Sequence, residues 1–95
     1  MFVISEILWL DDIVAKIEQK HRVSMDEVEQ VLHHRPKVKR LERGRVVGED
    51  LYVALGQTEA GRHLSVFFIR KDNSRALIIS ARDMDAKERR RYARK

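Results

Sequence analysis

The 95-residue sequence has no cysteine, one proline and four glycines. Without cysteine the chain can form neither a disulfide framework nor a thiol-based active site, and a reducing cytoplasm suits it. It also lacks a glycine-rich phosphate loop, a nucleotide-binding fingerprint and a Ser-His-Asp order. The adjacent residues His33 and His34 would point about 100° apart on a helix, which is not the arrangement of a metal-binding pair. We therefore expect no cofactor and no metal.

Long hydrophobic runs are also missing. The most apolar early segment, Phe2 to Leu10, is interrupted by Glu6 and ends at Asp11. It is too short to span a bilayer, and it lacks the basic start and small-residue cleavage site of a signal peptide. Without an internal repeat or a linker, residues 1–95 are expected to form a single cytoplasmic domain with no membrane partner.

Charge is the most prominent feature that the sequence does have. Twenty lysines and arginines stand against fifteen acidic residues, which gives a net charge of +5, and hydrophobic residues make up 43%. This hydrophobic content excludes a disordered chain. The positive charge favours an anionic partner, with nucleic acid ahead of a membrane surface, although a basic protein without such a partner fits the composition equally well.

Two apolar runs dominate the C-terminal half, one from Leu64 to Ile69 and one from Ala76 to Ile79. The polar stretch 71–74 between them has turn chemistry, so the pair is predicted to form an antiparallel hairpin. Arg62 precedes the first run and Arg82 follows the second. Alternation places Arg62 on the face of Leu64, Val66 and Phe68, and Arg82 on the face of Ala76, Ile78 and Ser80. The far ends of the two hairpin strands lie close together, so these arginines can be neighbours at one end of the sheet.

The N-terminal half is predicted to contain a short strand within residues 2–9 and a helix that follows it. Asp11 or Asp12 offers an N-cap for this helix, and an apolar stripe with helical spacing runs to about His21. Its last turn is basic, which suits the negative end of the helix dipole.

Capping boxes mark the start of two further helices, S-M-D-E at residues 24–27 and D-A-K-E at residues 85–88. The first of these helices should stop near residue 34, because Pro36 cannot donate a backbone hydrogen bond. Further strands are predicted near residues 37–43 and 51–55. The expected fold is therefore α+β, with two N-terminal helices packed on one face of an antiparallel sheet of about four strands, and a peripheral C-terminal helix.

Several segments resemble one known family when they are taken together. They are Trp9 with a helix ending in Lys20-His21 and then Val23-Ser24, the helix that opens with S-M-D-E, the stretch from Gly56 to Gly61-Arg62, and Ile78 to Arg82 followed by Glu88 to Tyr92. In these segments the chain is similar, over residues 7–92, to BrnT, the toxin of a prokaryotic type II toxin–antitoxin pair. The I-I-S-A-R…E-R-R-x-Y ending is the most specific part of the resemblance.

The resemblance implies a RelE-like ribonuclease fold that cleaves mRNA, free or bound to the ribosome, and inhibits translation. It also implies a small DNA-binding antitoxin as a partner, and it allows a homodimer within the toxin–antitoxin complex. The helical side, with Trp9, is the surface on which we expect the antitoxin. The chain departs from the family in two places: Arg22 replaces the usual glycine after the Lys-His pair, and an extra hydrophobic segment, Met1 to Ile4, stands at the N-terminus.

RNA cleavage without a metal needs positive charge for the phosphate and groups that transfer protons. Arg62 and Arg82 can supply the charge, because guanidinium groups match phosphate oxygens and stay protonated. By the family resemblance, Arg82 and Tyr92 are catalytic or contact the substrate. His21 and Lys20 are the candidates for proton transfer, His21 because its reference pKa lies near neutral pH.

Each of these residues also has a purely structural interpretation. His21 could be a packed histidine at a helix end, Arg62 could pair with an acid, and Tyr92 could be the aromatic side chain that docks a polar helix. The basic run on the last helix cannot face one ligand with all its members. Arg89, Arg90 and Ser80 are the residues that we expect to contact RNA.

The leading functional hypothesis is thus an endoribonuclease toxin. A catalytically inactive RNA-binding module on the same fold is the alternative. A DNA-binding regulator is least favoured, because the second helix carries Asp26, Glu27 and Glu29 where a helix facing phosphates would avoid acids.

Overall fold

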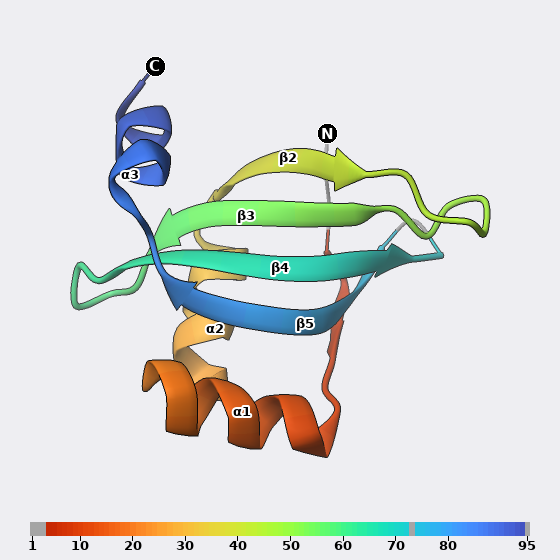
Figure 1. Ribbon diagram of the computed structural model, residues 1–95, viewed down its shortest axis with the longest axis horizontal. Helices are drawn as coiled ribbons and strands as arrows, with labels where there is room; N and C mark the ends of the chain where they lie inside the picture. Colours follow the sequence, from red (N-terminus) through yellow and green to blue (C-terminus); the bar gives the residue numbers. More distant parts are fainter. Residues whose placement is uncertain (1–3, 73, 95) are drawn as a thin grey trace.

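The computed structural model describes residues 4–72 and 74–94, which form three helices and a five-stranded sheet with the order β1-β5-β4-β3-β2. Helices α1 and α2 lie against one face of this sheet, and α3 stands at the end where β5 finishes (Figure 1). The helices are α1 (Asp11–His21), α2 (Met25–His33) and α3 (Ala86–Ala93). The strands are β1 (Glu6–Leu8), β2 (Lys37–Glu42), β3 (Leu51–Gln57), β4 (His63–Lys71) and β5 (Arg75–Asp83).

The α+β class and the central hairpin are confirmed. The expectation of about four antiparallel strands is wrong, because β1 adds a fifth strand that pairs with β5 in parallel, with Glu6 opposite Arg75. This arrangement arises because α1 and α2 carry the chain from the β1 edge across to the β2 edge before the antiparallel strands begin. Of the strand predicted within residues 2–9, positions 2 and 3 lie outside the described residues.

The predicted helix starts are partly confirmed. Both capping boxes are present, Ser24 with Glu27 at the start of α2 and Asp85 with Glu88 at the start of α3. The N-cap of α1, however, is Leu10, which makes no side-chain cap hydrogen bond. The aspartates at positions 11 and 12 instead lie in the first helical turn, where their charge favours the positive end of the helix dipole. The prediction that one of them is the N-cap is therefore wrong.

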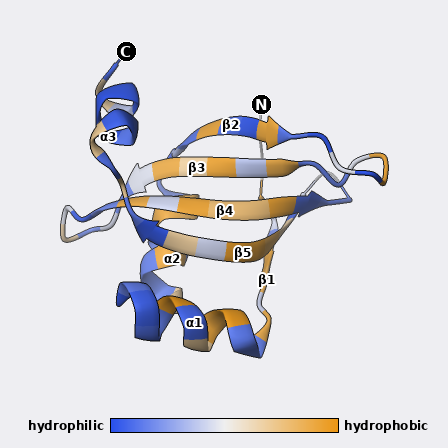
Figure 2. Cartoon of the chain, viewed as in Figure 1, coloured by the Kyte–Doolittle hydropathy of each residue, from blue (hydrophilic) through white to orange (hydrophobic). Residues whose placement is uncertain are grey.

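The main core lies between the sheet and the two early helices. Leu64, Val66 and Phe68 of β4 are fully buried there against Ile17 of α1 and Val28 of α2. The opposite face of the sheet, called the open face below, carries a smaller buried group of Val53, Leu55 and Met84, against which Phe67 and Tyr92 pack. Figure 2 shows hydrophobic residues along β3, β4 and β5, whereas α3 is almost entirely hydrophilic.

A β-bulge in β5 decides which face the last strand residues occupy. Phe68 pairs with Ile78 and Phe67 pairs with Ser80, so Ile79 has no partner on β4. Beyond this extra residue the alternation is reversed, and Arg82 pairs with Ser65 on the open face. Arg62 lies on the helix side. The two arginines are therefore at the same end of the sheet but on opposite faces, and the prediction that they are neighbours is wrong.

Candidate functional site

Arg62 is held entirely by protein groups on the helix side of the sheet. Its guanidinium donates to Asp83 (Nε–Oδ1 2.8 Å, Nη2–Oδ2 3.2 Å) and, through Nη1, to both carboxylate oxygens of Glu27 at 3.2 Å. It also donates to the backbone oxygens of Arg22 (2.7 Å) and His21 (3.0 Å), at the end of α1. The bond to Asp83 raises the pKa of Arg62 and lowers the pKa of Asp83. Arg62 thus links α1, α2, β4 and β5.

The predicted proton-transfer residues lie in the same region as Arg62. Lys20 is exposed near the end of α1, and His21 is half-buried at the last position of the helix. His21 lies close enough to Asp83 that its positive charge, after that of Arg62, lowers the pKa of this carboxyl group. The structure therefore gathers Lys20, His21 and Arg62 on the helix side, away from Arg82.

Arg82 projects from β5 onto the open face, where Glu88 of α3 holds it. The two side chains form a fork of parallel hydrogen bonds, with Nη1–Oε1 at 2.7 Å and Nη2–Oε2 at 2.9 Å. The Arg82 guanidinium carbon also lies 5.1 Å from the centre of the Phe67 ring. Since the side chain of Arg82 remains 35% exposed, its guanidinium is fixed in orientation and still reachable from solvent.

Glu88 combines two roles in one carboxylate. Besides the fork with Arg82, it accepts a hydrogen bond from the backbone N–H of Asp85 at 2.9 Å, which completes the capping box of α3. Burial opposes ionisation of Glu88, but the hydrogen bonds from Arg82 and Asp85 outweigh burial and lower the pKa of Glu88. The carboxylate is thus ionised at neutral pH, and it couples the position of α3 to the position of Arg82.

Tyr92 lies one helical turn beyond Glu88 and docks α3 on the sheet. Its ring packs against the small open-face core and meets His63 of β4 edge to face, with ring centres 5.7 Å apart. The ammonium group of Lys37, from β2, lies 5.8 Å from the centre of the same ring. Tyr92 therefore docks α3 on the sheet, and the same contacts place the phenol ring beside an imidazole and a cation.

His63 is a candidate that sequence reasoning missed. Burial, and secondly the charge of Arg89, lower its pKa, so the imidazole is neutral at pH 7 and can accept a proton. No pattern in the sequence distinguishes this histidine from a surface residue. The only available signal is that alternation from Arg62 puts position 63 on the opposite face, together with Phe67.

The predicted RNA-contacting residues are only partly gathered at this place. Ser80 pairs with Phe67 and shares the open face with Arg82. Arg89 lies near enough to His63 to shift its pKa, whereas Arg90 lines a separate shallow hollow on α3 with other basic residues of that helix. We call Arg82, Glu88, Phe67, His63 and Tyr92 the Arg82 cluster.

Neither a metal site nor a membrane-spanning helix is found in the part of the chain that the structure describes. Residues 4–72 and 74–94 contain no group of three or more histidine, aspartate or glutamate side chains placed to hold a metal ion. No helix among them is long and apolar enough to cross a membrane.

These features define a small basic α+β domain with two helices on one sheet face and a cluster of guanidinium, imidazole and phenol groups at one end of the other. Residues 9–88 match the sequence model of the family described as "Ribonuclease toxin, BrnT, of type II toxin-antitoxin system". The chain belongs to this BrnT family, and a type II system implies a protein antitoxin as its partner.

The fold agrees with this assignment. A crystal structure of the Brucella abortus ribonuclease toxin BrnT is similar to 84% of this chain and 96% of its own, with a TM-score of 0.60 and 20% sequence identity. No curated protein matches the sequence.

Arg22 stands where the family pattern has a glycine, and its backbone adopts the left-handed conformation that glycine favours. Arg22 is the C-cap of α1 and has a left-handed conformation with φ 54°. Its N–H donates to the carbonyl oxygen of Glu18, and the N–H of Val23 donates to the carbonyl oxygen of Ile17, which closes the helix. The turn between α1 and α2 is therefore a left-handed turn built with a residue that adopts it at a cost.

Proposed function

We propose that this chain is the toxin of a type II toxin–antitoxin system, a metal-independent endoribonuclease that cleaves mRNA in the cytoplasm and inhibits translation. Membership of the BrnT family supports the toxin role. The observation that carries the assignment of the site is the Arg82 cluster, because three elements, β4, β5 and α3, bring a cation, a neutral imidazole and a phenol to one end of the open face.

Each member of the cluster has a role in this proposal. Arg82 binds the scissile phosphate and stabilises the charge that develops on it, since its guanidinium is already oriented by Glu88. His63 accepts the proton of the 2′-hydroxyl group, and Tyr92 donates to phosphate or to the leaving oxygen. Neighbouring nucleotides stack on the Phe67 ring, hydrogen-bond to the Ser80 hydroxyl and place a phosphate near the charge of Arg89.

His21 and Lys20, with Arg62, form a second possible location for proton transfer, on the helix side. The Arg82 cluster is favoured, because Arg62 already donates to two carboxylates and two backbone oxygens. Replacing His63 by Gln should then reduce cleavage, whereas His21→Gln should leave it nearly unchanged. The opposite result would move the chemistry to the helix side.

The function is tested by incubating purified protein with an mRNA in the presence of EDTA, with and without ribosomes. We expect cleavage that persists in EDTA, and a loss of about 100-fold or more in Arg82→Ala, because removing a principal charge-stabilising donor has effects of this size. The same variant should no longer arrest growth or block translation in a cell-free system. Full activity of folded Arg82→Ala would contradict the proposed site.

The second candidate function is RNA binding without cleavage. It is favoured by one observation, the complete fork between Arg82 and Glu88, since a paired arginine can hold a surface together without chemistry. Under this alternative the protein retards RNA in a gel but leaves it intact at every pH and in the presence of ribosomes.

A further inference from the structure

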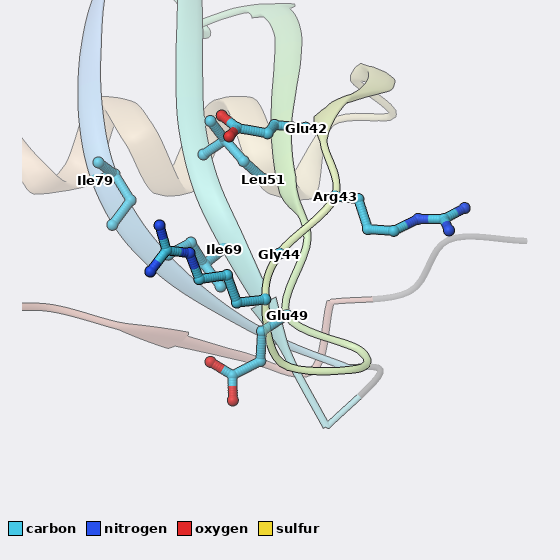
Figure 3. Close-up of a pocket in the computed structure, with 8 residues that line it drawn as sticks. Glu42, Arg43, Gly44, Glu49, Leu51, Ile69 and Ile79 are labelled. Atoms are coloured by element: carbon cyan, nitrogen blue, oxygen red, sulfur yellow. The ribbon is translucent and has the colours of Figure 1, made fainter.

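A hollow with an aliphatic floor lies on the open face, beside the loop between β2 and β3. Figure 1 shows this loop at the end of the sheet far from α3. Its volume is about 300 Å³. Leu51 of β3, Ile69 of β4 and Ile79 of β5 form the floor, and the loop between β2 and β3 forms the rim (Figure 3). Ile79 is the bulged residue of β5, so the irregularity that turns Arg82 to the open face also supplies part of this floor.

The floor continues as a row of aliphatic side chains across four strands. Leu51 pairs with Ile69, Ile69 pairs with Leu77, and Leu77 pairs with Leu8 of β1. Residues that pair directly share a face of the sheet, so this row lies on the open face, and all four residues are only half-buried. Helices α1 and α2 cover the other face, and α3 contacts the opposite end of β3 through Tyr92. Such a contiguous aliphatic surface is typical of a protein-binding site.

The charges around the hollow favour an acidic occupant. The rim residues Arg43 and Arg45 make no ion pair with the rest of the described chain, whereas the rim carboxylate of Glu49 is bound by Lys71 at 2.5 Å. Glu42 is the one acidic rim residue that is left without an ion pair among residues 4–72 and 74–94. The chain as a whole carries a net charge of +5. Two copies of this surface would bring like charges together, which disfavours a homodimer through it.

The floor itself favours protein over RNA. Single-stranded RNA is bound by stacking of bases on aromatic rings and by phosphate contacts, and no aromatic residue lines this hollow. Leucine, isoleucine and valine side chains of a protein segment would instead fill an aliphatic floor and exclude water from it. At the tip of the same loop, Val46 is 58% and Val47 is 99% exposed, which extends the apolar surface beyond the rim.

We propose that this aliphatic hollow is the docking surface for an acidic amphipathic segment of the antitoxin. The identity of the partner rests on the proposed toxin function, while the chemistry of the segment follows from the surface: aliphatic side chains enter the hollow and carboxylates meet Arg43 and Arg45. The surface is at the other end of the open face from the Arg82 cluster. Docking therefore does not require the catalytic side chains, and an inactive Arg82→Ala toxin still binds the antitoxin.

The experiment measures the affinity between the purified chain and the antitoxin encoded with it, by titration calorimetry. Ile69→Glu places an unpaired charge in the floor and should weaken binding by about 100-fold or more, as expected for loss of a central interface residue. Arg45→Glu, in an exposed loop that cannot affect folding of the sheet, should weaken binding by about tenfold. Leu10→Glu is the matched control, because Leu10 is an apolar residue, 46% exposed, on the helical side.

The result expected is loss of antitoxin binding in Ile69→Glu and Arg45→Glu, unchanged binding in Leu10→Glu, and unchanged RNA cleavage by all three proteins. Loss in Leu10→Glu alone would overturn the proposal and place the antitoxin on the helical side. A fall in RNA affinity in Arg45→Glu, or a dimer of the free toxin that Ile69→Glu dissociates, would overturn it in favour of RNA or a second copy. Absence of RNA cleavage in every protein, with the same binding pattern, would reject the nuclease function while leaving the docking surface supported.

Discussion

Replacing Arg62 by Ala should unfold the protein at a much lower temperature without removing a catalytic group. The side chain of Arg62 is 27% exposed and donates to two carboxylates and to two carbonyl oxygens at the end of α1. Hydrogen bonds to charged groups contribute about 1.5–3 kcal/mol when they are buried, and much less when the partner is exposed. Asp83 is 64% exposed, so its bond to Arg62 is discounted most strongly.

The sum of these contributions gives a loss of about 2–4 kcal/mol in the free energy of unfolding. A domain of this length is stabilised by about 5–14 kcal/mol in total, so the loss is a large fraction. It corresponds to a decrease of roughly 10–25 °C in Tm. Thermal unfolding followed by circular dichroism measures this change. Arg75→Ala is the matched control, because among residues 4–72 and 74–94 Arg75 forms ion pairs with the exposed side chains of Asp72 and Glu6, and its loss should cost less than about 1 kcal/mol.

Acid titration provides a second measure of the same interaction. Because Arg62 lowers the pKa of Asp83, folding favours the ionised carboxyl group, and this stabilisation is present at neutral pH. It is lost as the pH falls below the ordinary aspartate pKa, about 3.9, and through the lowered folded value. Arg62→Ala should therefore flatten the acid side of the stability curve. A folded Arg62→Ala protein that keeps its Tm and loses RNA cleavage would refute this reasoning and return Arg62 to the list of catalytic candidates.

Three further predictions concern the cluster and the turn after α1. Glu88→Gln keeps a residue that can complete the capping box but removes the charge that holds Arg82, so cleavage should fall about tenfold or more while helix content by circular dichroism is retained. Arg89→Gln removes a charge that lowers the pKa of His63, so the acid limb of the cleavage rate should move to higher pH, whereas Arg90→Gln should not move it. An unchanged limb in both variants would exclude His63 as the proton acceptor. Arg22→Gly should raise the free energy of unfolding by about 0.5–1 kcal/mol in denaturant titrations, because glycine adopts φ 54° without strain; a lower stability would show that Arg22 is not strained.

Local patterns predicted most of the secondary structure. The capping boxes at Ser24 and Asp85 were found at both expected places, because each depends on residues three positions apart in the chain. The central hairpin followed from two apolar runs around a polar turn. The start of α1 was placed wrongly by one or two residues, because an aspartate stabilises the first helical turn as well as the N-cap position.

The candidate site was harder to predict, because one extra residue in β5 determines its composition. Strict alternation places Arg62 and Arg82 together, and the bulge at Ile79 separates them onto opposite faces. A bulge leaves no reliable signal in an isoleucine-rich strand, since it is fixed by how the strand pairs with its neighbours. The same long-range pairing brings His63 to Tyr92 and gives Glu88 its partner in Arg82, which is why neither contact was predicted.

The sequence by itself determined the α+β composition, the hairpin, two helix starts and, through motifs spread over its length, the family. These properties depend on residues near one another in the chain or on patterns that need no coordinates. Only the tertiary structure decided which cations share a face, because that depends on strand register and on the direction from which α3 returns to the sheet. It thereby assigned Arg62 to holding the helices together and placed Arg82, bonded to Glu88, on the open face of the sheet, where His63 also meets Tyr92.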